Sequence, residues 1–189
     1  MDETSGSIRF IPGSRTIDGR GRGKVRVTPF ERALLDLLPR LRRFARALAL
    51  DAADADDLCQ LALERALKAE GQWQIGTRLD SWMYRIMRNI WIDEIRARKR
   101  RAETFVPEEE GEMVGDADHA RIEARVELGK VDRAMAALPP EQREVIALIL
   151  VEGLAYREAA EALDLPMGTV TSRLVRGRQA LMEMLGEST

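Results

Sequence analysis

Apolar side chains recur at steps of three and four residues along most of this chain, and that spacing constrains the fold more than any other feature. Between Phe30 and Leu50 the repeat consists of Leu34, Leu38, Leu41, Ala45 and Leu48, which would lie on one side of a helix. A second repeat follows carboxylates at Asp54 and Asp56 that suit a helix N-terminus. A third repeat runs from about Asp80 to Arg100. The chain is therefore predicted to be all-α, with these three helices in one bundle.

The stretch from Ala102 to Ala120 interrupts this periodicity and divides the chain in two. It is acidic, contains Pro and Gly, and ends shortly before helical spacing resumes near Ile122. We therefore predict a disordered basic tail (1–28), a front helical domain (29–101), a flexible acidic linker (102–121) and a rear helical domain (122–189).

Composition narrows the kinds of function that the chain can have. Its 189 residues include one cysteine, Cys59, and one histidine, His119, so the chain alone cannot build a disulfide or a conventional zinc site. The longest apolar run, Val145 to Val151, is far shorter than the roughly 18 residues that a membrane helix needs. We expect a cytoplasmic protein without membrane insertion, metal or cofactor, which is not an enzyme and acts by binding.

The rear domain has the order of helical segments and turns that is typical of a helix-turn-helix. Pro140 suits a helix start, and after Val151 come a short segment from Tyr156 to Leu163 and a turn at residues 164–168. At about 100° per residue, the last helix would turn Val170, Leu174 and Leu181 to the core. The opposite face suits the major groove of duplex DNA and carries Thr169, Ser172, Arg173 and Arg176. A solvated charged face is the alternative, but the position after the turn favours DNA.

The third helix of the front domain combines aromatic and basic side chains. One face carries Arg85, Asn89 and Arg96, with Arg88 at its flank. Trp82 and Trp91 could stack on unpaired bases while the arginines hold the backbone, as in proteins that bind single-stranded nucleic acid. For Trp91, burial in the core is the favoured alternative.

Two blocks of sequence resemble the extracytoplasmic-function (ECF) sigma factors of the sigma-70 family. The front block, D-A-D-D-L-C-Q followed by L-D-S-W-M-Y-R-I-M-R-N-I-W-I-D-E-I-R-A-R-K-R-R, looks like sigma region 2. The rear block, L-P-P-E-Q-R-E-V-I-A-L through M-G-T-V-T-S-R-L-V-R-G-R-Q-A-L, looks like sigma region 4. Both blocks stand in the order and spacing of the family. The resemblance implies an alternative sigma factor that binds core RNA polymerase and directs it to promoter DNA.

The resemblance also implies roles for individual residues. Asp57, Leu58 and Gln60 would dock on the beta-prime clamp helices of polymerase. The loop from Gly71 to Ser81, which includes Thr77 and Arg78, would read the melted minus-ten element together with Asn89 and its helix. Arg173 and Arg176 would read the minus-thirty-five element. An anti-sigma factor is an expected further partner.

Two positions depart from the common family pattern. Thr171 stands where Lys is frequent, which puts one phosphate contact in doubt. Gly177 stands where Ala is usual, and it lowers the helix propensity of the last helix. Neither departure removes a residue of the predicted groove face.

Three alternative functions remain open at this point. A sigma-like decoy would bind an anti-sigma factor without touching promoters, but the retained basic faces count against it. A helix-turn-helix regulator would bind duplex DNA without polymerase, with the front domain as a ligand or dimer module. An enzyme is the third, and it would depend on a metal site at Asp54, Asp56 and Asp57.

Overall fold

The computed structural model describes residues 27–73, 76–104 and 129–186, and no strand occurs in these ranges. The helices are α1 (Pro29–Ala49), α2 (Ala52–Lys68), η1 (Glu70–Gln72), α3 (Leu79–Thr104), α5 (Pro140–Ile146), η2 (Ala147–Val151), α6 (Tyr156–Leu163) and α7 (Met167–Leu185). Residues 129–137 are helical as well. The all-α prediction is confirmed. Most of the predicted tail and most of the predicted linker lie outside the described residues, although Thr28 of the tail caps α1.

Side-chain caps explain where the first two helices begin. The Thr28 hydroxyl accepts a hydrogen bond from the Glu31 N–H at 3.0 Å, and the Glu31 carboxylate accepts one from the Thr28 N–H at 2.6 Å, which is a capping box. Asp51 caps α2 by accepting from the N–H groups of Ala53 and Asp54. These bonds, that from Asp54 above all, lower the pKa of the Asp51 carboxyl. The sequence predicted Asp54 and Asp56 as N-cap or first-turn carboxylates, and Asp54 does lie in the first turn, while Asp51 is the cap.

The front bundle packs α1, α2 and α3 around large buried side chains. Phe44 of α1 and Tyr84 of α3 meet edge to face with ring centroids 4.8 Å apart. Trp91 is 5% exposed, so the interpretation of this tryptophan as a core residue is confirmed. Helix α3 ends at Thr104, three residues beyond the predicted domain boundary at Arg101.

The rear domain forms the predicted helix-turn-helix. Pro140 is the first residue of α5, as predicted. The chain then widens into the π-helical turn η2, where the Glu152 N–H bonds to the Ala147 carbonyl, and a positive φ at Gly153 ends that turn. Asp164 takes a left-handed conformation after α6. In α7, Val170 and Leu174 are buried, as the angular spacing predicted.

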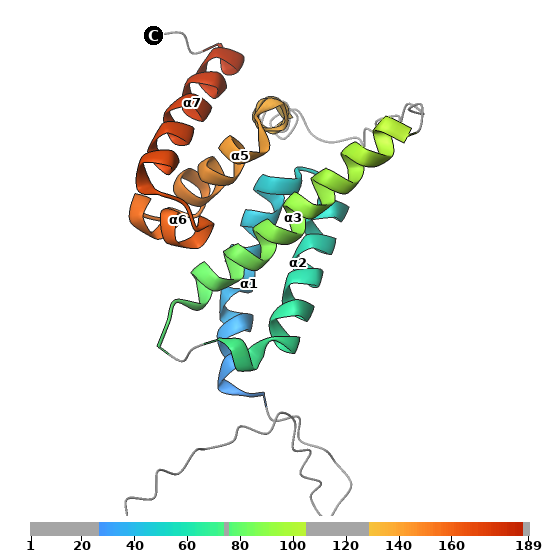
Figure 1. Ribbon diagram of the computed structural model, residues 1–189, viewed down its shortest axis with the longest axis vertical. Helices are drawn as coiled ribbons and strands as arrows, with labels where there is room; N and C mark the ends of the chain where they lie inside the picture. The colour runs from blue at the N-terminus through green and yellow to red at the C-terminus, as the bar shows by residue number, and fades with distance from the viewer. Residues whose placement is uncertain (1–26, 74–75, 105–128, 187–189) are drawn as a thin grey trace, which may run out of the picture.

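The two domains pack directly against each other. Figure 1 shows α5 and α6 beside the first half of α3, and the contacts join α3 to α6 and α1 to η2. The buried apolar residues of both domains form one contiguous cluster, in which Leu41 and Leu48 of α1 belong with Ile146 and Leu148 of the rear domain. The sequence predicted two small domains joined by a flexible linker and gave no sign of this shared core.

Candidate nucleic-acid interface

The basic face of α3 meets the rear domain in this structure. Arg88 donates from Nε to Oε2 of Glu144 on α5 at 2.7 Å. Arg85 donates from Nη2 to the carbonyl oxygen of Glu161 on α6 at 2.6 Å. Two arginines predicted to hold melted DNA are thus hydrogen-bonded to the helix-turn-helix domain.

The loop before α3 joins the same junction through Arg78. Its guanidinium pairs with Glu158 on α6 and with Asp80 at the start of α3. Burial would raise the pKa of the Asp80 carboxyl, but hydrogen bonds from Arg78, from the Ser81 N–H and from Arg40 outweigh it and leave this pKa below its ordinary value. Thr77, in the same loop, is exposed.

The remaining predicted minus-ten residues lie outside these contacts. Asn89 and Arg96 on α3 are exposed, and Arg96 has Asp93 one turn away at 4.0 Å. Trp82 is partly buried and meets the ring of Phe30 edge to face at 6.1 Å. The predicted surface therefore divides into a covered part around Arg88 and an open part around Asn89 and Arg96.

The predicted recognition helix α7 is only partly covered. Arg173 donates from Nη1 to Oε1 of Glu144 at 3.0 Å and is partly buried. Arg176 and Ser172 are exposed, and each donates a hydrogen bond to a carbonyl oxygen of its own helix. Thr169, in the first turn of α7, is partly buried. The predicted face exists as a surface, and Arg173 is the member that is already paired.

Glu144 is the residue on which the two basic faces converge. Its side chain is fully buried, and it accepts from Arg88 of the front domain and from Arg173 of the recognition helix. Burial raises the pKa of the Glu144 carboxyl above its ordinary value, although both arginines act in the opposite direction. Carboxylate and phosphate present similar oxygens to a guanidinium. Glu144 therefore pairs with two of the arginines that the sequence predicts to bind DNA.

A second buried glutamate, Glu152, binds the front domain alone. Its carboxylate accepts from Arg40 and Arg43 of α1, each with its closest approach at 3.2 Å, and from the hydroxyl of Tyr84 at 2.9 Å. Burial of Tyr84, with the neighbouring Glu152 charge, raises the pKa of this hydroxyl well above its usual range. No partner of Glu152 comes from its own domain among these contacts.

The sequence analysis did not single out these two glutamates or Arg40 and Arg43. A signal was present: Glu144 and Glu152 stand directly before and after the apolar run Val145 to Val151. Charged side chains are almost never fully buried unless they are paired. Two glutamates bordering the most apolar run of the chain were therefore candidates for buried ion pairs.

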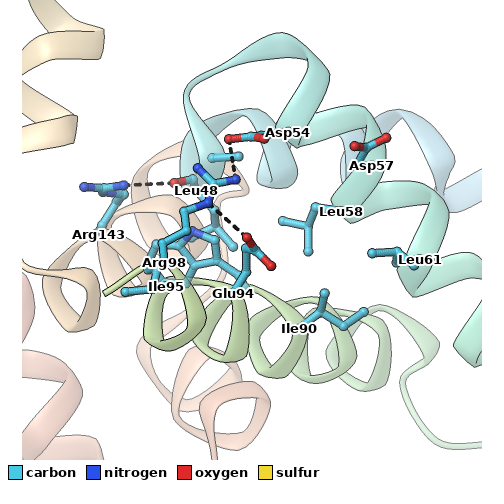
Figure 2. Close-up of a pocket in the computed structure, with 12 residues that line it drawn as sticks. Leu48, Asp54, Asp57, Leu58, Leu61, Ile90, Glu94, Ile95, Arg98 and Arg143 are labelled. Carbon is cyan, nitrogen blue, oxygen red and sulfur yellow. Dashed lines mark hydrogen bonds and ion pairs between the residues drawn. The ribbon is translucent and has the colours of Figure 1, made fainter. Parts of the chain in front are cut away.

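The predicted polymerase surface lies on α2. Asp57 and Gln60 are exposed, but Leu58 is 5% exposed and belongs to the core, so it supports this surface from below. Figure 2 shows Asp57 and Leu58 at a cavity between α2 and α3. The cavity has a volume of about 320 Å³ and includes Arg143 of the rear domain, whose Nη1 donates to the Leu48 carbonyl at 3.0 Å.

The described part of the chain contains neither a cluster suited to a metal ion nor a helix suited to a membrane. No group of three or more His, Cys, Asp or Glu side chains in it is arranged to hold a metal ion, and Asp54 of the predicted rival site pairs with Arg98 at 2.7 Å. None of the described helices combines the length and apolar character that crossing a membrane requires.

Comparison with known proteins identifies both domains. The family model for sigma-70 region 2 matches residues 34–101, and the model for sigma-70 region 4 matches residues 128–181. The ECF RNA polymerase sigma factor EcfG of Rhodopseudomonas palustris is 32% identical over 159 residues, which cover 80% of this chain and 82% of the relative. The chain belongs to the ECF sigma factors. SigW of Bacillus subtilis, also an ECF sigma factor, is 31% identical over 70% of this chain and 75% of its own.

Solved structures of related proteins share the fold of this ECF sigma factor. The sigma factor RpoE of Bartonella quintana, in complex with the anti-sigma factor NepR, has 30% identity and a TM-score of 0.68, over 85% of this chain and 98% of its own. CnrH in complex with the cytosolic domain of CnrY has 25% identity and a TM-score of 0.63, over 85% of this chain and 89% of its own. The match in the front domain favours a sigma factor over a helix-turn-helix regulator that acts without polymerase.

Proposed function

We propose that this ECF sigma factor binds core RNA polymerase in the cytoplasm through α2 and directs it to promoters through α3 and α7. It acts by binding and carries out no chemistry of its own. The observation that carries the proposal is the convergence of Arg88 and Arg173 on one carboxylate. These arginines come from the two regions that the family models match, and guanidinium groups that bind a carboxylate are equally suited to phosphate.

Within this proposal, the exposed side chains of α2 dock on the beta-prime clamp helices of polymerase. Asp57 and Gln60 are one turn apart and both exposed, so they can reach a partner without any change in the bundle. Leu58 acts indirectly, because it holds α2 against α3 from within the core.

On α3, the loop at Thr77 and Arg78, with Trp82, Arg85, Arg88, Asn89 and Arg96, forms the proposed minus-ten surface. Four of these are basic and suit the backbone of a single strand, while Trp82 offers a ring for stacking. On α7, Thr169, Ser172, Arg173 and Arg176 form the proposed minus-thirty-five surface. An anti-sigma factor is a proposed third partner, supported by the complex with NepR in which the related RpoE was solved.

Reconstituted transcription tests the function and the polymerase surface together. Purified core polymerase with the full chain should start transcripts from specific sites on genomic DNA fragments, and core polymerase alone should not. The double variant Asp57→Ala with Gln60→Ala should weaken binding to core polymerase in a titration by about tenfold, with duplex DNA binding of the free chain unchanged.

A matched pair on the same helix serves as control. Glu64→Ala and Arg65→Ala remove exposed side chains further along α2 and should leave binding to core polymerase unchanged. Absence of any specific transcript start would refute the function. Specific starts with unaltered core binding by the double variant would refute the α2 surface alone.

A further inference from the structure

Two buried carboxylates of region 4 hold the basic residues of region 2 in this structure. Glu152 binds Arg40, Arg43 and Tyr84, and the Glu144 carboxylate joins Arg88 to Arg173. Both glutamates border the apolar segment through which η2 packs on α1. The ion pairs and the shared core therefore form one continuous junction between the two regions.

The junction covers the surfaces that the proposed function requires. Arg78, Arg85 and Arg88 are all bonded to region 4, to Glu158, the Glu161 carbonyl and Glu144 respectively. Each of these guanidinium groups donates to an acceptor on α5 or α6, so a DNA backbone would compete with region 4 for its donors. Melted DNA and region 4 thus compete for one face of α3.

We propose that the free chain is self-inhibited, with Glu152 as the latch that holds region 4 over the minus-ten surface of region 2. The proposal rests on the proposed function for the meaning of that surface. Glu152 affects only the position of region 4, since its partners Arg40, Arg43 and Tyr84 are not among the proposed DNA contacts. Once region 4 is seated, Glu144 occupies Arg88 and Arg173 in place of phosphate, so one docking event engages a residue of each proposed promoter surface.

The chemistry of the Glu152 site explains why it can work as a latch. Its side chain is fully buried, whereas the side chains of Arg40 and Arg43 remain 34% and 54% exposed. A buried carboxylate requires its donors, because an unpaired charge in the interior is strongly unfavourable. The arginines can return to water when the regions separate. The contact is therefore specific for the closed arrangement and reversible when polymerase or DNA competes for either region.

The test uses the full chain with Glu152→Gln, which keeps the shape of the side chain and removes its charge. A Gln amide cannot accept from both arginines and the tyrosine, since one of its two polar ends is a donor. Dyes attached at Arg65→Cys and Arg178→Cys report the distance between the regions, because both positions are exposed and the native Cys59 is buried. Binding is measured with a fluorescein-labelled DNA duplex of random sequence.

Glu152→Gln should lengthen the mean distance between the dyes and raise the affinity for the duplex about tenfold, since apparent affinity scales with the competent fraction. Glu141→Gln is the matched control, because it makes the same change in charge at an exposed position of α5. The control should leave the distance unchanged and the affinity within about twofold of the parent. Equal behaviour of the two variants in both measurements would overturn the proposal.

Two further variants keep the test decisive if Glu152→Gln fails to fold by circular dichroism. Arg43→Gln and Tyr84→Phe remove donors to Glu152 from the region 2 side and should shift distance and affinity in the same direction by smaller factors. Unchanged distances in both would overturn the latch. The dye distance involves neither promoter nor polymerase, so failure of the latch is distinguishable from failure of the transcription assay.

Discussion

The two halves of α3 carry ion pairs of different kinds. In the first half, Arg88 binds Glu144, whose side chain is fully buried. In the second half, Arg98 binds Asp54 and Glu94, whose side chains remain 34% and 47% exposed. An exposed pair contributes about 0 to 1 kcal/mol and is weakened by salt. A buried pair therefore joins the first half of α3 to region 4, whereas the pairs of the second half are exposed and lie within region 2.

Removing the shared carboxylate should produce the largest effect. Glu144→Ala leaves Arg88 and Arg173 largely buried without a counter-charge, so the free energy of unfolding should fall by about 3 kcal/mol. Glu94→Ala removes an exposed acceptor from Arg98 and Arg101 and should cost less than about 1 kcal/mol. Urea denaturation followed by circular dichroism measures both. Equal losses would mean that the two halves of α3 do not differ as their burial indicates.

The sequence predicted the apolar faces of individual helices but not the packing of region 4 on region 2. The spacing of Val170 and Leu174 predicted the buried face of α7, and Pro140 predicted the start of α5. Periodicity identifies the apolar side of a helix but not the neighbour that covers it. The docking of region 4 on α1 and α3 depends on contacts between residues far apart in the chain, 56 positions for Arg88 with Glu144 and 112 for Arg40 with Glu152. No local pattern encodes such a contact.

The residue types of the candidate site could be predicted from the sequence, but the ion pairs that these residues form in the folded chain could not. The angular arithmetic assigned Arg173 and Arg176 to one face, where Arg176 is exposed and Arg173 is partly buried. It treated them as equivalent, whereas Arg173 is paired with Glu144 and Arg176 is not. Leu58 was assigned to a surface by resemblance, and the structure buries it, because its position on α2 faces α3.

The next largest effect is expected on α7, where the exposed Arg176 is a better probe of DNA contact than the paired Arg173. Arg176→Ala should cost roughly 1 to 3 kcal/mol of minus-thirty-five binding if Arg176 pairs with a guanine. Arg178→Ala, about 180° around the helix from Thr169, should cost less. Fluorescence anisotropy with selected promoter duplexes measures both, after circular dichroism shows that the variants are folded.

Arg173→Ala is a poor substitute in that experiment, because it also removes a partner of Glu144. If Arg176→Ala weakens all sequences equally and lowers the salt slope by about one ion, the contact is to phosphate alone. Equal losses for Arg176→Ala and Arg178→Ala would show that the assignment of the groove face is wrong.

Asp80 gives a smaller, pH-dependent effect at the start of the covered half of α3. Its pKa is lowered in the folded chain, so its contribution to stability is present above the unfolded value and is lost as the pH falls through the folded value. Asp80→Asn should therefore reduce the free energy of unfolding at neutral pH by about 1 kcal/mol, a modest amount because the carboxylate keeps part of its hydration.

The difference between parent and Asp80→Asn should shrink as the pH falls below the ordinary carboxyl value of about 4 and through the lowered pKa of Asp80 in the folded chain. Urea titrations of both proteins across the acid range measure it. A difference that does not change with pH would indicate that Asp80 contributes through shape or capping and not through charge.

The smallest effect concerns Gly177, where α7 lies against α5 close to the Glu144 and Arg173 pair. A Cβ at Gly177 would stand 3.1 Å from Cγ1 of Ile146 and 3.3 Å from Cβ of Gln142. Gly177→Ala gains about 1 kcal/mol of helix propensity, and this close approach offsets most of it. Its melting temperature should therefore stay near that of the parent.

Gly168→Ala, with nothing within 4 Å of its Cβ, should raise the melting temperature. If Gly177→Ala raises the melting temperature as much as Gly168→Ala does, α5 must be able to shift away from the added methyl group. The position of Glu144 on α5 would then be less rigid than its two ion pairs indicate.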